Sequence, residues 1–208
     1  MATSGKSSKE RASGGEARPK GARARILDAA YELFLAGGIG AVGIDTITAR
    51  AGVAKMSLYR HFKSKDDLVL AYLNMREKRW TEDWLKAGLT RQKSSPEAAF
   101  VVIFDMYDRW FHQRDYEGCP FINTLLEVRS GEAVHDAAAH QLASIRAIVQ
   151  SLAEKAGFRD PDSLAKVWHM LMMGAIVAAS AGDKEAARHA RRAGEMILAA
   201  WPRIEPHP

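Results

Sequence analysis

The chain has 208 residues, of which 47% are hydrophobic and 26% are charged, and this composition is typical of a globular protein with a substantial core. Its single cysteine, Cys119, excludes an internal disulfide and a cysteine zinc site. The N-terminus lacks the apolar stretch of a secretory signal, and no uninterrupted apolar run is long enough to span a bilayer. We therefore expect a cytoplasmic protein without a membrane segment.

The positive charge of the chain is concentrated in its first third. The formal net charge is +5 and the isoelectric point is near 9.4. Residues 1–66 contain twelve basic and six acidic residues, whereas residues 67–208 contain eighteen basic and nineteen acidic ones. A basic N-terminal module on a nearly neutral body favours a protein whose first part binds a polyanion such as nucleic acid. A solubilising tail is the alternative.

The chain is predicted to be helical almost throughout after its first 21 residues. Those 21 residues are rich in Ser, Gly, Lys and Arg without apolar periodicity, which predicts disorder. In chain order, apolar spacing and helix-breaking residues predict helices over residues 26–36, 44–51, 55–62, 64–87, 96–113, 121–128, 132–156, 160–181 and 184–201. Ser64 and Asp67 have the spacing of a capping box at the start of the fourth helix. No segment shows sustained period-two alternation, so the fold class is predicted to be all-α.

The first three predicted helices form a unit of their own. They are short, they are joined by glycine-containing turns, and one long helix follows them. A helix, a turn of three to four residues and a second helix form the helix-turn-helix, whose second helix enters the major groove. We therefore divide the chain into a disordered basic tail (1–21), a helix-turn-helix DNA-binding domain (22–66) and a helical regulatory and dimerisation domain (67–208).

About forty residues within this region carry a more specific resemblance. The segments are ILDAAYELF at 26–34, GG at 37–38, IDTITARAGV at 44–53 and SLYRHFKSKDDL at 57–68. Together they strongly resemble the N-terminal domain of the TetR family of transcriptional regulators. The resemblance implies an all-helical homodimer that binds a double-stranded DNA operator through the N-terminal domain and a small-molecule effector through the C-terminal one.

The third predicted helix is expected to have an inner face and a DNA-contacting face. Leu58 and Phe62 lie four residues apart and should pack on the two preceding helices. Residues at the helix start should read bases, while cationic and hydroxyl side chains should contact phosphates. Two arginines are expected to precede the first helix and reach the minor groove. The candidate DNA-contacting residues are Arg23, Arg25, Thr46, Lys55, Met56, Ser57, Tyr59, Arg60, His61 and Lys65.

Two helix starts depart from the family pattern. The family usually has Ser or Thr before the second helix, where this chain has Gly43, and Ser before the third, where it has Ala54. Glycine is a tolerable cap, whereas alanine loses about 1 kcal/mol of capping energy. The fold prediction is unaffected, but the phosphate contacts of these caps are not carried over.

The last two predicted helices carry wide apolar stripes, from Trp168 to Ala179 and from Ala186 to Trp201. A surface this apolar should not stay exposed, and helix-turn-helix proteins read two half-sites about 34 Å apart. We therefore expect a homodimer formed through these two helices. Burial of both helices within one chain is the alternative.

A ligand site between helices is expected to be mostly apolar, with a few polar groups. The candidate ligand-binding residues are Trp80, Trp84, Tyr107, Trp110, Phe111, Cys119, Phe121, Asn123, Trp168, His169 and Met172. Cys119 has two interpretations: a redox or electrophile sensor with a lowered pKa, or a buried small hydrophobe, which we favour. The fourth helix is expected to be the lever between ligand and DNA, because it runs from the DNA-binding unit to Trp80 and Trp84.

The sequence therefore predicts a repressor that leaves a palindromic operator when a small molecule binds. Activation, and redox-dependent regulation through Cys119, stay open as alternatives. A helical enzyme or binding module is a further alternative, but the sequence contains no HExxH, no phosphate-binding glycine-rich loop and no GxSxG. Nor does it contain a carboxylate–histidine spacing suited to a metal site in a helical bundle. We expect no catalytic residue, no metal and no cofactor.

Overall fold

The computed structural model of the chain describes residues 21–92 and 95–205, and helices joined by short loops make up this part. Its elements are α1 (Ala22–Gly37), α2 (Ile44–Ala51), α3 (Lys55–His61), α4 (Lys65–Arg76), the π-helix η1 (Glu77–Lys86), α5 (Ala87–Arg91), α6 (Pro96–Phe111), α7 (Pro120–Glu127), α8 (Ala133–Lys155), α9 (Pro161–Ser180) and α10 (Ala186–Ala200). The all-α prediction is thus confirmed. The predicted tail lies outside the described residues, apart from Gly21.

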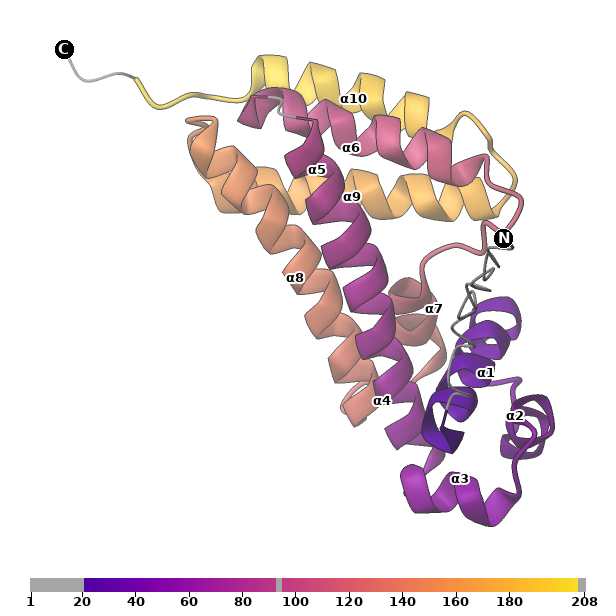
Figure 1. Cartoon of the computed structure of the whole chain (residues 1–208). Coiled ribbons are helices and arrows are strands. Elements are labelled where there is room, and N and C mark those ends of the chain that lie inside the picture. The colour runs from indigo at the N-terminus through magenta and orange to yellow at the C-terminus, as the bar shows by residue number, and fades with distance from the viewer. Residues whose placement is uncertain (1–20, 93–94, 206–208) are drawn as a thin grey trace, which may run out of the picture.

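The helices form two parts, which we call the head (α1–α3) and the body (α4–α10). Figure 1 shows the head at one end of the molecule, with α4 leading from it into the body. At the opposite end α6, α9 and α10 pack on one another, while α8 packs along α4 and on α9. α7 packs on α8 and α4 and lies close to the head.

The first helix begins earlier than the sequence analysis predicted. Arg23 and Arg25 lie in the first turn of α1, not in an arm that precedes it. Gly21 is the N-cap, and the residues that follow are alanine and arginine, both good helix formers. No helix-breaking residue therefore separates the two arginines from the apolar part of α1.

One continuous helical rod, made of α4, η1 and α5, connects the head with the far end of the body. It begins with the predicted cap: the Ser64 hydroxyl accepts from the Asp67 amide at 3.1 Å. The Asp67 carboxylate accepts at 3.0 Å from the amide of Lys63, the residue before the N-cap, so the arrangement is a variant of the predicted capping box. The π-helical segment in its middle was not predicted. Such segments are rare and occur frequently at functional sites.

The helix α9 has one buried side and one exposed apolar side. By length and mean hydropathy (1.3) it would qualify as a membrane span. It nevertheless packs against α8 and α10, where Trp168 and Met172 are fully buried. Met170 and Val177 are exposed. The helix therefore belongs to the protein core on one side and leaves apolar surface on the other.

Candidate DNA-binding surface and ligand region

The helix α3 has the buried face that the sequence predicted, and its opposite face, which is predicted to contact DNA, is exposed. Leu58 and Phe62 are buried, and α3 packs through them on α1 and α2. Met56 and Tyr59 are 67% and 43% exposed. A methionine and a tyrosine exposed side by side on a short helix are more typical of a binding surface than of a solvated one.

The starts of α2 and α3 leave backbone N–H groups without side-chain acceptors. The N-cap residues are Gly43 and Ala54, as predicted, and neither makes a side-chain capping hydrogen bond. Helix N-termini carry partial positive charge and accept anions readily. DNA phosphates are suitable partners for these groups.

Lys55, the first residue of α3, is held by α2. Its ammonium group forms an ion pair with the Asp45 carboxylate at 2.8 Å. The hydrogen bond and the negative charge of Asp45 raise the pKa of Lys55. Thr46, beside Asp45, is exposed. The pair fixes the direction of Lys55 before any DNA is bound, and it also places a carboxylate close to the expected position of the DNA.

The two arginines of α1 contact the rest of the head. The Arg23 guanidinium lies over the Phe62 ring, 5.0 Å from its centroid. Arg25 donates a long hydrogen bond of 3.5 Å to the Gly52 carbonyl. Both side chains are exposed. Contact with the minor groove stays a prediction, now for side chains on the first turn of α1 and not on a preceding arm.

The basic side chains in the last turn of α3 and at the start of α4 differ in their surroundings. Arg60 and His61 are exposed. Lys65 is half-buried, and its ammonium donates to the Ile39 carbonyl at 2.6 Å. The sequence did not predict this partner, which lies in the loop between α1 and α2.

Five of the aromatic residues predicted to line a ligand pocket form one packed cluster. Trp80 and Trp84 come from η1, and Tyr107, Trp110 and Phe111 come from α6. Their ring centroids are separated by 5.0 to 6.3 Å in the contacting pairs. The rings therefore fill the space between these helices with one another.

Polar atoms without partners lie on the same π-helical segment. The Trp80 indole N–H and the Thr81 hydroxyl are buried and make no hydrogen bond. Glu77 accepts a hydrogen bond of 2.9 Å from the Gln141 amide of α8, but the side-chain oxygen of Gln141 has no donor. A buried polar group without a partner costs about 1–3 kcal/mol. A partner that hydrogen-bonds to these groups would remove this cost.

The remaining predicted pocket residues of the core lie mainly towards α9. The Trp168 ring contacts Phe104 at a centroid distance of 5.2 Å, and Phe104 contacts Tyr107 of the first cluster at 6.1 Å. His169 is buried, and burial together with the charge of Arg146 lowers its pKa to about 4. Phe121 and Met172 are also buried.

The helix α7 and its N-cap hold three of the predicted residues, the buried Phe121 and two others in contrasting environments. Cys119, its N-cap, is 4% exposed, and burial raises the pKa of the thiol. A raised pKa disfavours the reactive thiolate, so the structure favours the buried hydrophobe over the sensor. Asn123 is exposed and lines a small hollow between α7 and α1 together with Phe34 and Glu127. Asn123 therefore lies apart from the aromatic cluster, and its contact with a ligand stays a prediction.

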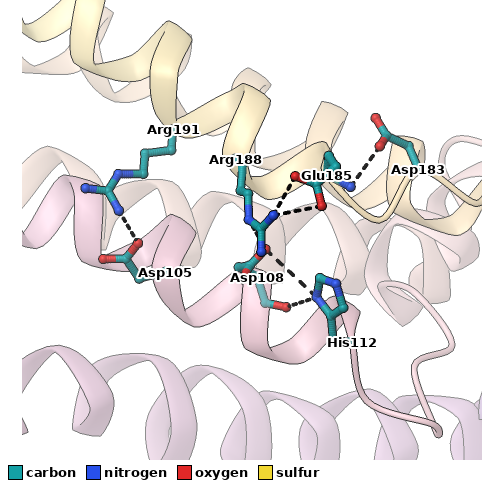
Figure 2. Close-up of polar contacts among 7 residues, drawn as sticks. All are labelled: Asp105, Asp108, His112, Asp183, Glu185, Arg188 and Arg191. Atoms are coloured by element: carbon teal, nitrogen blue, oxygen red, sulfur yellow. Dashed lines mark hydrogen bonds and ion pairs between the residues drawn. The ribbon is translucent and has the colours of Figure 1, made fainter.

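Charged side chains connect α10 to α6 (Figure 2). Arg191 pairs with Asp105 at 2.6 Å, and Arg188 pairs with Asp108 at 3.3 Å. Because these side chains are partly exposed, each pair contributes at most about 1 kcal/mol. Their main effect is to fix which side of α10 faces the body, and Met196 on the same helix is left 74% exposed.

Together these features define a helical DNA-binding protein with a separate body that holds aromatic and unpaired polar groups. The family described as "Bacterial regulatory proteins, tetR family" matches residues 26–72, and "Tetracyclin repressor-like, C-terminal domain" matches residues 99–194. A solved TetR-family transcriptional regulator from Streptomyces coelicolor is 31% identical, with a TM-score of 0.76 over 86% of this chain and 94% of that one. The chain therefore belongs to the TetR family of DNA-binding transcriptional regulators, as its sequence indicated.

Further relatives agree with this assignment. A solved putative TetR transcriptional regulator from Streptomyces avermitilis is 26% identical, with a TM-score of 0.77 over 87% of this chain and 98% of that one. The transcriptional regulator QacR of Staphylococcus aureus is 40% identical over 62 residues, which are 30% of this chain and 33% of QacR. The transcriptional activator FasR of Mycolicibacterium smegmatis is 34% identical over 128 residues, 55% of this chain and 56% of FasR. The chain thus matches about a third to just over half of these two curated relatives.

Proposed function

We propose that this protein is a homodimeric repressor that binds a palindromic operator and is released from it by a small molecule. The observation that carries the proposal is the exposed face of α3, where Lys55, Met56 and Tyr59 stand away from the buried Leu58. One such helix fits one major groove, and two related by a dimer axis fit two half-sites. Repression needs only occupancy of the operator, whereas activation needs a further contact with the transcription machinery.

The exposed apolar surface of α9 and α10 supports dimerisation. Met170, Gly174 and Val177 lie at i, i+4 and i+7 and so share one stripe of α9. Met196 of α10 is exposed as well. Glycine within the stripe permits close approach of a second helix, and a self-complementary patch of this kind suits a two-fold interface. We infer that α9 and α10 pack against their counterparts in a second copy of the chain.

The continuous rod from α4 to α5 supports ligand-dependent release. η1 lies in the middle of this rod and carries both Trp80 and Trp84, whose rings contact α6. A ligand that enters between η1 and α6 would separate them and change the direction of α4. The spacing of the two recognition helices would change with it. The unpaired Trp80 and Thr81 groups favour a planar ligand that bears a hydrogen-bond acceptor.

Operator binding is tested by a mobility shift of the purified protein with its own upstream intergenic DNA across a salt series. We expect a specific complex that salt weakens and that Tyr59→Ala abolishes. Lys55→Ala should also weaken it and lower the salt dependence by about one released counterion. Lys155→Ala, an exposed lysine at the far end of α8, is the matched control and should bind like the wild type. Absence of a specific complex, or indifference to both α3 variants, would contradict operator binding through α3.

Dimerisation is tested separately by light scattering. Val177→Glu places a charge in the proposed interface and should yield monomers. Leu126→Glu changes an apolar residue of α7 that is even more exposed (78%) but lies outside α9 and α10, and it should remain dimeric. The opposite pattern would place the interface elsewhere.

A further inference from the structure

A single peptide group in the head is held from two sides by the body. The Gly40 amide donates to the Glu127 carboxylate at 3.0 Å, and the Ile39 carbonyl accepts from the Lys65 ammonium at 2.6 Å. The Ile39 carbonyl and the Gly40 N–H belong to the same peptide bond. Glu127 is the last residue of α7 and Lys65 the first residue of α4. The loop between α1 and α2 is therefore fastened to two separate elements of the body through one planar group.

The loop backbone is shaped to fit the carboxylate. Gly38 has a φ of 77°, a conformation that favours glycine. A Cβ at Gly38 would lie 2.8 Å from the carboxylate Oε1 of Glu127. The second glycine of the pair at 37–38 thus does more than end α1, because it also allows the backbone to approach Glu127. Any larger residue at this position would push the carboxylate away from the Gly40 amide.

The order of charges strengthens both contacts. A carboxylate accepts from the N–H of the peptide and an ammonium group donates to its C=O, so the two charges polarise the peptide in the same direction. Glu127 is exposed and Lys65 half-buried, which keeps the contribution to stability modest. The arrangement is better suited to fixing a position than to holding the fold together.

The other end of α7 reaches the core of the body. Cys119, its N-cap, and Phe121, in its first turn, are buried. The helix has eight residues and is therefore about 12 Å long. This short helix therefore links the core of the body at one end to the Ile39–Gly40 peptide of the head at the other.

We propose that Glu127 is a positioning residue and that, together with Lys65, it clamps the Ile39–Gly40 peptide to set the orientation of the head on the body. The clamp adds to the covalent connection through α4 and to the packing of α1 on α4, where Tyr31 and Phe34 contact Tyr72, and it links α7 to the start of α4. The effect on DNA affinity rests on the proposed operator binding, whereas the effect on head orientation does not.

The orientation is measured without DNA on the full chain. Spin labels attached through Met56→Cys in the head and Ala147→Cys in the body, in a Cys119→Ala background, report the head–body distance. We expect Glu127→Ala to broaden the distance distribution. Leu126→Ala, on the same turn of α7, should leave the distribution unchanged. Glu127→Gln should give a distribution close to that of the wild type, because its side-chain carbonyl still accepts from the Gly40 amide. An unchanged distribution in Glu127→Ala would overturn the proposal.

Operator affinity provides a second measurement. For Glu127→Ala, the clamp and simple electrostatics predict opposite changes in this affinity. Loss of the Glu127 charge would by itself strengthen binding to DNA. The clamp instead predicts that Glu127→Ala weakens operator binding about three- to ten-fold. The salt dependence should not change, since no phosphate contact is lost. Glu132→Ala removes a nearby carboxylate that is outside the clamp and should not weaken binding. Equal or tighter operator binding by Glu127→Ala overturns the clamp. If the wild-type protein forms no specific complex with the operator, the proposed function is contradicted. The distance measurement alone then decides whether the clamp exists.

Discussion

Acid should destabilise this protein through His169. Burial, and to a lesser degree the charge of Arg146, lower the pKa of this side chain from 6.5 to about 4 in the folded state. Between these two values the unfolded chain binds a proton that the folded chain excludes, so stability falls as the pH decreases through this window. The full difference corresponds to about 3 kcal/mol below pH 4, and roughly 2 kcal/mol is already lost at pH 5.

The assay is urea unfolding at pH 8 and pH 5, at one fixed protein concentration because dimer dissociation contributes to stability. Other groups titrate in this range as well, so the relevant quantity is the difference between wild type and His169→Gln. We expect the variant to lose about 2 kcal/mol less than the wild type between the two pH values. Arg146→Gln removes the smaller cause and should reduce the loss only in part. An equal loss in wild type and His169→Gln would refute the assignment of a lowered pKa to this residue.

Three further predictions concern the head and the core. Asp45→Asn frees Lys55 and removes a carboxylate from the DNA-facing side, so anisotropy titrations at low salt should show about two- to five-fold tighter binding to operator and random duplex alike; unchanged affinity would mean that the ion pair does not compete with DNA. Cys119 should react with a thiol reagent far more slowly in the folded protein than in urea, and similar rates would contradict its burial. In Gly194→Ala the new methyl group would lie 2.5 Å from the Trp168 ring, so α10 must shift, and urea unfolding should show a loss of about 1–2 kcal/mol after the gain in helix propensity.

The helices could be predicted from the sequence because their ends are encoded locally. Gly52 ends α2 in a left-handed conformation, the Ser64 hydroxyl caps α4, and Pro161 stands in the first turn of α9. The π-helical segment has no comparable local signal. Its wider turn changes which side chains of Glu77–Lys86 face the core, and that outcome depends on how Trp80 and Trp84 pack against α6.

The exposed face of α3 was accessible to sequence reasoning because its residues lie on one short helix, where spacing alone separates the buried Leu58 from the exposed Tyr59. The aromatic residues of the body were identified by type. Whether they enclose a void or fill it is decided by packing between helices, however, and composition does not report packing.

The sequence did not predict the contacts of Glu127 and Lys65 with the loop between α1 and α2, because they join residues that are distant in the chain. Glu127 lies 87 residues from its partner Gly40, at the end of a short helix and outside any motif. The glycine pair at 37–38 is the only sequence feature connected with this contact. The end of the first helix already explains why glycines stand there. A glycine can permit a turn and a close backbone contact at the same position. Because the turn explained Gly38, the sequence contains no separate sign of its close contact with Glu127. Lys65 is a similar case: a lysine beside a recognition helix suggests a phosphate contact, yet its ammonium donates to the Ile39 carbonyl. The salt dependence of operator binding in Lys65→Met separates the two roles, because it falls by about one if Lys65 contacts phosphate and stays unchanged if Lys65 acts through the clamp.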